Sequence, residues 1–351
     1  MRAPVFWQAP PPGQHHRWPQ RCAMLLWPLS LLMRLLVRLR QGLYLSGVLK
    51  RHSAPVVMVV VGNVVAGGGG KTPTVIALVE HLRARGLKPG VISRGYGRSK
   101  SADGEDCREV RPDSPVDQVG DEPMLIQRRT GVPVFIARRR IDAARALLAA
   151  HPEVNILVSD DGLQHLALAR DIEICVFDDR GLGNGLLLPA GPLREPWPRY
   201  VDLVLHTGQQ PAFTGHAARR ALANSAVDAR GRSVALDSLP SPLVAVAGTA
   251  QPQAFFDMLR ARGLSLAHAE ALPDHAGIPE YAHWHAALKQ AHAAGPVTVL
   301  CTEKDAAKLW TICPEALAVP LVFELPPAFV GEFDRLLHDA FAAHLSSAYT
   351  H

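Results

Sequence analysis

A glycine-rich segment followed by a lysine and a threonine offers the clearest chemistry in the chain. Residues 56–74 read VVMVVVGNVVAGGGGKTPT, in which an apolar run leads into glycines and then into Lys71 and Thr72. Glycines let backbone N–H groups turn toward a phosphate, and a following helix adds its positive N-terminal end. Lys71 would reach the β- and γ-phosphates of a nucleotide, and Thr72 would ligate Mg²⁺. Val65 stands where the strict motif has its first glycine, so the loop is expected to use Gly67, Gly68, Gly69 and Gly70.

Two acidic pairs that follow apolar runs compete for the role of metal ligand. Asp160 and Asp161 follow VNILVS, whereas Asp178 and Asp179 follow IEICVF. A carboxylate at the end of a buried strand can hold Mg²⁺ directly or through water. The first pair is favoured because Gly162 and the QH after it form a tight loop, although either pair could simply cap its strand.

Other polar residues have more than one interpretation. Asp121 precedes a predicted helix, where it acts either as an N-cap or as a general base. The sequence TEKD at 302–305 resembles the guanine-reading signature of GTPases, but its lysine comes one position late, so guanine specificity is not predicted. Asp274 and His275 form an Asp-His pair, which is a weak signal alone.

Metal binding by cysteine or histidine is not expected. The five cysteines are scattered without a CxxC pair, which argues against a disulfide scaffold and suits a reducing compartment. Four histidines cluster in sequence without matched carboxylate or cysteine partners, so a zinc site is not predicted at His275, His283, His285 and His292.

The elements that must position these residues alternate between strands and helices. Apolar runs predict strands at 56–62, 90–93, 132–137, 154–159, 172–177, 201–206, 242–248 and 297–301. Helical periodicity occurs at 72–86, 139–150, 252–262, 281–294 and 328–345. This alternation predicts an α/β fold with helices on both sides of a mainly parallel sheet. Two long loops, 94–120 and 179–199, are expected to be functional rather than surface decoration.

Length and charge divide the chain into a globular body and a basic front end. The 351 residues, 48% of them hydrophobic, correspond to two domains and exclude a largely disordered protein. The net charge is +5, yet no acidic residue precedes Glu80, and residues 1–79 carry nine of the 37 lysines and arginines. The remaining 28 basic residues face 32 acidic ones, so the body is acidic, and the basic segment is expected to meet an anionic surface.

The basic segment contains a leucine-rich helix. Residues 1–20 are proline-rich and expected to be poorly ordered. The apolar stretch that follows is interrupted by Pro28 and arginines, and it is shorter than the ~20 residues of a spanning helix. Its polar residues form one stripe, which predicts a helix in a membrane interface with arginines directed at lipid phosphates: Ser30, Arg34, Arg38 and Gln41. Alternatively, its apolar face packs on the protein itself. Nucleic acid is disfavoured because leucines separate the cations.

Taken in order, several segments resemble those of the tetraacyldisaccharide 4′-kinase family, the inner-membrane kinases of lipid A synthesis. They are GKTP, SRGYGR, GDEP, DDGLQH, PAGPLREP, PDH and TEKDAAKL, and the resemblance covers most of the chain. One departure is GGGG in place of the usual GGTG, which leaves the backbone amides available. The resemblance implies that ATP and Mg²⁺ phosphorylate the 4′-hydroxyl of a tetraacylated glucosamine disaccharide 1-phosphate.

The resemblance also implies an organisation and a set of site residues. The expected fold is a P-loop α/β/α domain and a smaller α/β/α domain joined by a β-strand linker, at the cytoplasmic face of the inner membrane. The expected parts are an extension (1–22), an interfacial helix (23–50), the kinase domain (51–207), the linker (208–240) and the smaller domain (241–351). The implied roles are Lys71 and Thr72 for phosphate and metal, Asp160 and Asp161 for metal, Asp121 with His275 for the acceptor hydroxyl, and Arg94, Tyr96 and Arg194 for substrate. We expect a monomer whose partners are the lipid and the membrane surface.

Two other functions remain open from the residues themselves. A cytosolic nucleotide switch, of the metallochaperone or partitioning ATPase type, would form nucleotide-dependent dimers and hydrolyse ATP without a lipid acceptor. A non-enzymatic membrane-surface protein with a degenerate loop would bind no ATP.

Overall fold

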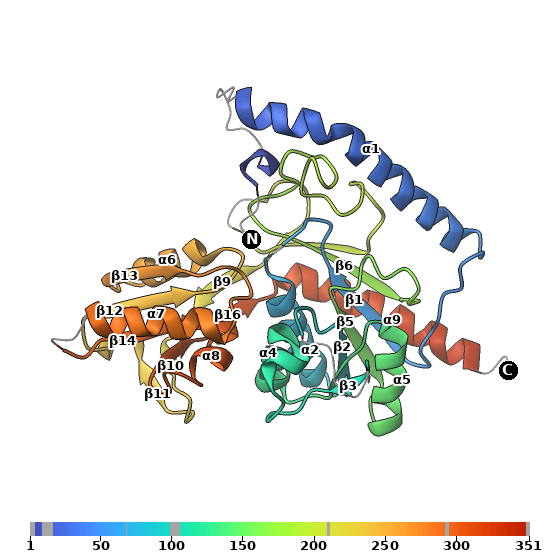
Figure 1. Ribbon diagram of the computed structural model, residues 1–351. Helices are drawn as coiled ribbons and strands as arrows, with labels where there is room; N and C mark the ends of the chain where they lie inside the picture. Colours follow the sequence, from blue (N-terminus) through green and yellow to red (C-terminus); the bar gives the residue numbers. More distant parts are fainter. Residues whose placement is uncertain are drawn as a thin grey trace.

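Two β-sheets, each covered by helices on both faces, form the framework of the chain (Figure 1). The computed structural model describes residues 4–8, 17–67, 69–98, 106–208, 211–291 and 295–348. Gly68 of the predicted phosphate loop and His292 of the histidine cluster therefore lie outside the described residues, as do parts of 1–20 and of the loop at 94–120.

The larger sheet has eight strands in the order β3-β4-β2-β5-β1-β6-β7-β8. They are β1 (Val57–Gly62), β2 (Pro89–Ser93), β3 (Arg108–Glu109), β4 (Val134–Ile136), β5 (Ile156–Asp160), β6 (Ile172–Phe177), β7 (Leu203–His206) and β8 (His216–Ala217). All pairings are parallel except that of the edge strand β3 with β4. Strands β1, β2, β5 and β6 are buried along their whole length, as their continuous apolar sequences predict.

Helices cover both faces of the larger sheet. On one face, α2 (Lys71–Ala84), α4 (Asp121–Thr130) and α9 (Pro327–Ala348) share a core with alternate residues of β1. On the other face, α5 (Arg140–Ala150) packs together with parts of the loop at 179–199. A single turn, α3 (Val116–Val119), leads into α4.

The smaller sheet has six strands in the order β11-β10-β15-β14-β12-β13. They are β10 (Ser225–Val227), β11 (Ser233–Ala235), β12 (Leu243–Ala247), β13 (Leu266–Ala271), β14 (Thr298–Thr302) and β15 (Leu317–Val319). Helices α7 (Ile278–Ala291) and α8 (Glu303–Leu309) pack on one face, and α6 (Pro252–Ala261) packs on the other. A short 3-10 helix, η2 (Leu236–Ser238), joins β11 to the core. All the strands predicted from the sequence occur, and the structure adds β3, β8, β9, β10, β11, β13, β15 and β16.

The chain crosses between the sheets twice, and the two crossing segments pair. Strands β9 (Arg219–Leu222) and β16 (Leu321–Glu324) form a separate antiparallel sheet. The predicted linker at 208–240 is thus partly structured, since β8 belongs to the larger sheet and β10 and β11 to the smaller one. The last helix also differs from its predicted place in the smaller domain. The side chains of Phe329 and Phe333 on α9 are fully buried against the larger sheet, because helical periodicity identifies an apolar face but not the sheet that it covers.

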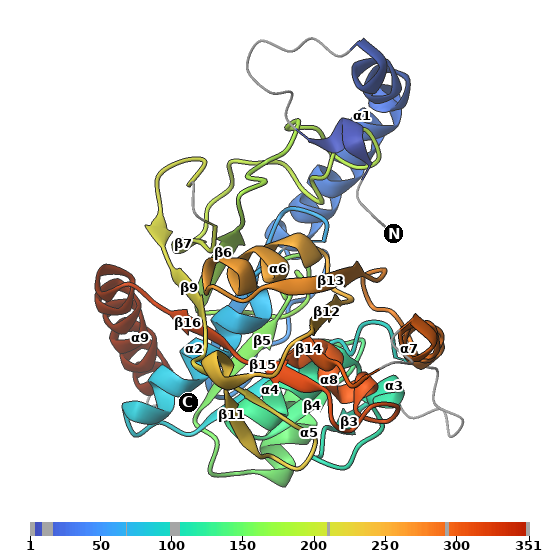
Figure 2. The same cartoon turned by 90° about the vertical axis from the view of Figure 1, so that its left-hand side faces the viewer.

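Helix α1 (Arg17–Leu45) lies along the outside of the larger lobe, over the loop at 179–199 (Figures 1 and 2). The hydroxyl of Ser30 donates to the carbonyl of Leu187 (2.6 Å) and accepts from the Ala190 N–H (3.1 Å). Two members of the predicted polar stripe, Ser30 and Gln41, therefore face the protein rather than lipid, while Arg34 and Arg38 are exposed. The loop supplies polar backbone partners that helical periodicity alone does not reveal.

Much of the other surface of α1 is apolar, and the described residues do not cover it. Exposed side chains include Leu25, Leu29, Leu32, Leu36 and Leu39. Within the described ranges, the segment Arg21–Leu45 is the one helix long and apolar enough to cross a membrane, judged by length and composition. The sequence prediction had considered this stretch too short to span. The helix continues through Pro28, which makes its regular part longer than expected.

Candidate functional site

The phosphate loop connects β1 to α2, as predicted. Gly70 precedes α2 with φ 95°, and a Cβ atom there would lie 2.5 Å from the hydroxyl of Thr207, so only glycine fits. Lys71 and Thr72 are the first residues of α2 and are buried. The loop therefore presents a helix N-terminus, with Lys71 and Thr72 beside it, as an anion site requires.

Asp178, from the less favoured acidic pair, supports this loop. Its carboxylate accepts the Gly69 N–H at 2.9 Å and is held by Arg180, which also donates to the carbonyl of Gly67. Gln251, from the smaller lobe, donates to the same carboxylate at 3.1 Å. Asp178 thus holds the backbone of the phosphate loop. The sequence shows only that Asp178 follows β6 and does not predict this contact.

Asp160 ends β5 and is almost fully buried. One carboxylate oxygen, Oδ2, accepts from Ser93 at 3.3 Å, whereas Oδ1 has no hydrogen-bond partner among the described residues. Burial, followed by the nearby charges of Glu122 and Asp161, raises the pKa of Asp160 to about 7. Lys71 and Arg140 oppose this shift only in part. The positive charges near Asp160 therefore do not offset its burial and its acidic neighbours, and its Oδ1 atom has no hydrogen-bond donor among the described residues.

Asp161 lies at the start of the loop after β5, with φ 48°. Its carboxylate is 3.8 Å from Lys71 Nζ and accepts two hydrogen bonds of 3.0 Å from Arg194. Burial raises the pKa of Asp161, but Lys71 and Arg194 outweigh this effect and hold it below its usual value. The buried guanidinium of Arg140 donates to the carbonyls of Asp160 (3.4 Å) and Asp161 (3.2 Å), a contact that the sequence did not indicate.

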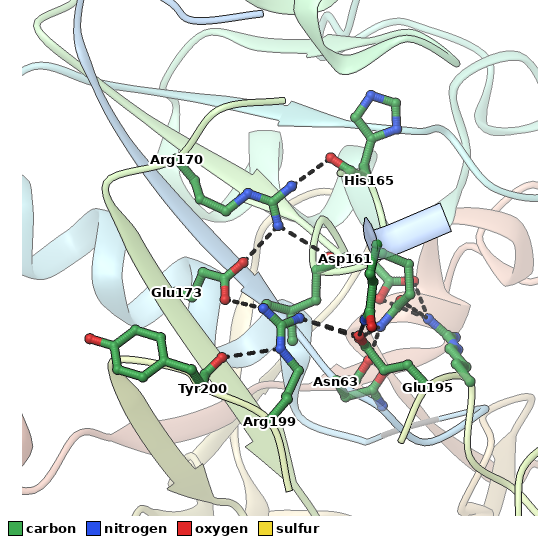
Figure 3. Close-up of polar contacts among 12 residues, drawn as sticks. Asn63, Asp161, His165, Arg170, Glu173, Glu195, Arg199 and Tyr200 are labelled. Carbon is green, nitrogen blue, oxygen red and sulfur yellow. Dashed lines mark hydrogen bonds and ion pairs between the residues drawn. The ribbon is translucent and has the colours of Figure 1, made fainter. Parts of the chain in front are cut away.

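A chain of polar and charged side chains leads from Asp161 toward α1 (Figure 3). Arg194 contacts Gln164 (3.3 Å), and Gln164 donates to Glu195 at 2.7 Å. Glu195 also accepts from Gln41 of α1 at 3.3 Å. Beyond Glu195, the network continues through Arg199, Glu173 and Arg170. Helix α1 and the acid at the phosphate loop are therefore joined by continuous hydrogen bonds.

Asp121 opens α4 and is brought together with His275, as predicted. The Nδ1 of His275 lies 3.2 Å from Asp121 Oδ2, and it donates because the carboxylate is ionised. His275 has φ 59° and is held by its N–H bond to the carbonyl of Gly248 (3.3 Å). The residues meet across the two lobes although 154 positions separate them in sequence.

Asp121 has a second partner, the cation Lys308, that the sequence prediction missed. Lys308 of α8 places Nζ 2.7 Å from Oδ1 and 2.8 Å from Oδ2. Burial raises the pKa of Asp121, but the hydrogen bonds from His275 and Lys308 outweigh it and keep the pKa below the usual value. One signal was available, since Lys308 follows Lys304 by four positions and thus shares its helix face.

Residues of TEKD have structural and electrostatic roles rather than a guanine-reading one. Thr302 caps α8, and buried Asp305 accepts from the Gly248 N–H (3.1 Å) and the Tyr281 hydroxyl (2.6 Å). Lys304 lies 3.4 Å from Asp274. Asp305 thereby fixes Gly248, whose carbonyl in turn holds the loop containing His275.

The loop with Arg94 and Tyr96 adjoins the same site. A Cβ atom on Gly120 would lie 3.0 Å from the carbonyl of Tyr96, which brings this loop against the start of α4. The ring of Tyr96 lies 5.6 Å from the ring of His275. Arg94 is exposed, and the described part of the chain offers it no hydrogen bond or ion pair. Arg194, in contrast, is engaged by Asp161.

Among the clustered histidines, His285 does meet a cysteine and a carboxylate, those of Cys313 and Glu315. Burial, followed by the charge of Glu315, raises the pKa of Cys313 to about 12, so it remains a thiol and hydrogen-bonds Glu315. The structure therefore corrects the expectation that no such partners exist.

Comparisons with known proteins agree with this arrangement. The sequence model of a family described as tetraacyldisaccharide-1-P 4′-kinase matches residues 22–340. A tetraacyldisaccharide 4′-kinase of Acidovorax sp. (strain JS42) is 56% identical over 329 residues, covering 93% of this chain and 92% of the relative. That of Polaromonas naphthalenivorans (strain CJ2) is 57% identical over 324 residues, covering 90% and 91%.

A solved structure is similar over nearly the same extent. The "apo" form of LpxK from Aquifex aeolicus in complex with ATP has a TM-score of 0.74 and 26% identity, covering 91% of this chain and 99% of that one. The fold, the order of the sequence motifs and the similarity to these proteins all indicate the same family. The chain belongs to the tetraacyldisaccharide 4′-kinase family, the ATP-binding kinases of lipid A biosynthesis.

Proposed function

We propose that this kinase transfers the γ-phosphate of ATP to the 4′-hydroxyl of a membrane-bound tetraacyl disaccharide 1-phosphate, with Asp121 as the general base. The observation that carries the proposal is the contact between Asp121 and His275 across the two lobes. Glu122, next to Asp121, acts electrostatically on Asp160, so the base lies near the acids beside the phosphate loop. An acceptor hydroxyl and a nucleotide phosphate can therefore meet there.

The nucleotide would bind at the phosphate loop. Backbone N–H groups of Gly67 and Gly70 and the N-terminus of α2 would supply donors, and Gly68 belongs to the same motif. Lys71 would neutralise charge on the γ-phosphate during transfer, when positioning and electrostatics dominate the rate. Its present partner, Asp161, keeps the ammonium at the loop.

Mg²⁺ fits the acids beside this loop. Asp160 has a buried oxygen without a partner among the described residues, Asp161 lies 3.8 Å from Lys71, and Thr72 directly follows Lys71 in α2. Hard oxygen ligands of this kind are those that Mg²⁺ prefers, usually with retained water. Bound Mg²⁺ would supply charge neutralisation on the phosphates. Arg140 and Arg194 would hold the acids in place through the hydrogen bonds described above.

The acceptor would be bound between the lobes. Asp121 would accept the proton of the 4′-hydroxyl, and His275 would orient the carboxylate by its Nδ1–H bond. Arg94 and Tyr96, which are exposed, would contact the sugar or its 1-phosphate. Arg194, predicted to bind substrate, would act there only in addition to its ion pair with Asp161.

The enzyme would work as a monomer at the cytoplasmic face of the inner membrane, without nucleic acid. The exposed leucine face of α1 supports this location, together with the outward-facing Arg34 and Arg38. Each basic residue near an anionic leaflet contributes about 1 kcal/mol to binding. A substrate with four acyl chains stays in the bilayer, so a kinase held at its surface meets the substrate directly.

Variants of the base test the proposal. Asp121→Asn should lower kcat by at least about 100-fold, the usual contribution of a general base, while the Kd for ATP stays within about threefold. Phosphorylated lipid is measured with labelled ATP, and omission of Mg²⁺ should abolish the product. Full activity of Asp121→Asn would remove Asp121 from the role of base, and activity without a divalent cation would refute the metal assignment.

A further inference from the structure

Lys308 is a fully engaged cation at the interface between the lobes. Its ammonium has three N–H donors and three acceptors: both oxygens of Asp121, at 2.7 and 2.8 Å, and the carbonyl of Ala276, at 2.8 Å. The side chain is 13% exposed. A lysine so enclosed has no donor left for bulk water, so its charge is directed at these acceptors.

We propose that Lys308 is a positioning residue for phosphoryl transfer, which fixes Asp121 relative to His275 and keeps its carboxylate ionised. The inference rests on the proposed role of Asp121 as the base. Asp121 begins α4 in the larger lobe, whereas Lys308 comes from α8 in the smaller lobe. A single ammonium therefore bridges the two elements that must come together for the reaction.

The contact with Ala276 makes the bridge more specific. Ala276 directly follows His275. Lys308 therefore binds the carboxylate of Asp121 and also the backbone carbonyl next to His275. His275 needs this support because its φ of 59° is unfavourable for a residue with a Cβ atom. Without Lys308, both Asp121 and the loop of His275 should be less firmly held, so the distance between the two side chains should vary more.

The charges around Asp121 explain why Lys308 also controls ionisation. Asp121 faces His275 from its loop, Lys304 and Lys308 from α8, and Tyr281 from α7, while Glu122 neighbours it on α4. Burial raises the pKa of Asp121, and His275 and Lys308 counteract it. Without Lys308, burial is opposed mainly by His275, so the carboxylate holds its proton to higher pH. A protonated Asp121 cannot accept the proton of the hydroxyl.

The test compares kcat and KM over about pH 4 to 9 for Lys308→Met, Lys308→Gln and Lys308→Arg in the full-length enzyme, because the low pKa of Asp121 places the acidic limb of the parent at the bottom of this range. Lys308→Gln removes the charge but keeps two N–H donors on a side chain that is one bond shorter, and it serves where the Met variant does not fold. Lys289→Met, which removes an exposed lysine from α7, is the matched control.

We expect the neutral variants to lower kcat at pH 7 at least about tenfold and to move the acidic limb of the profile upward by about one pH unit or more. The KM for ATP should change by less than about threefold, Lys308→Arg should restore most of kcat, and Lys289→Met should match the parent. An unchanged kcat, or a uniform loss at all pH values without a shift of the limb, would overturn the inference. Asp121→Asn, assayed in parallel, separates the two claims. If Asp121→Asn is inactive but the acidic limb of the Lys308 variants does not move, only the role of Lys308 is refuted. If Asp121→Asn is active, the role of Asp121 as the base is refuted.

Discussion

Substitution of serine for Leu32, Leu36 and Leu39 on α1 should weaken binding to lipid vesicles about 100-fold. Their side chains are 52%, 52% and 57% exposed and share one side of the helix. Full burial of a leucine contributes about 1.5–3 kcal/mol, so half-exposed leucines contribute about 1 kcal/mol each when they enter lipid. Three of them give about 3 kcal/mol, which corresponds to about two powers of ten in partitioning.

The assay is sedimentation with vesicles of phosphatidylethanolamine and phosphatidylglycerol, with the bound fraction measured against lipid concentration. Leu345→Ser on α9 is the control, because that side chain is 62% exposed but lies far from α1 in sequence. Thermal unfolding of the triple variant should match that of the parent, since the three side chains make little contact with the protein. An unchanged bound fraction would show that the enzyme meets the membrane through another surface.

Three further predictions concern the phosphate loop and the fold. Asp178→Ala should weaken ATP binding about tenfold or more, because hydrogen bonds to a charged group contribute about 1.5–3 kcal/mol and Gly69 and Arg180 would lose theirs; calorimetry giving the parent Kd would contradict this role. Gly70→Ala should abolish tight ATP binding by forcing a Cβ atom against Thr207, and equilibrium dialysis showing normal binding would refute that view of the loop. Phe333→Ala should lower the free energy of unfolding by about 3–5 kcal/mol in urea titrations, and a loss below about 1 kcal/mol would argue against α9 as part of the larger core.

The parts of the fold that were predictable are those with a strong local pattern. The strands that precede the phosphate loop and the acid pair are continuous apolar runs, and β1 and β5 occur where these runs lie. Strands such as β9 and β13 carry polar or alternating residues and are partly exposed, so they have no such signature. They are held by pairing with strands that the local sequence does not specify.

The site shows the same division between local and distant information. Lys71, Thr72, Asp160 and Asp161 lie in short motifs, and the motif order was enough to predict them together. Lys308 was missed because its partner lies 187 positions away, and only the folded interface brings them together.

Helix α1 was predicted as an element, but the environment of its polar residues was not. Ser30 faces inward because the loop at 179–199 offers a carbonyl and an N–H at that point. Helical periodicity shows which residues share a face of the helix. Which part of the protein packs against that face depends on the tertiary fold.

The destination of the γ-phosphate tests the central claim most directly. The full-length enzyme in mixed vesicles is given γ-labelled ATP, Mg²⁺ and the tetraacyl disaccharide 1-phosphate, and lipid and aqueous products are separated after less than one turnover. The account predicts that the label appears on the lipid at its 4′ position, that this product is lost in Asp121→Asn, and that little inorganic phosphate forms without the acceptor. Label released only as inorganic phosphate, at the same rate with and without lipid, would contradict it and favour a nucleotide switch.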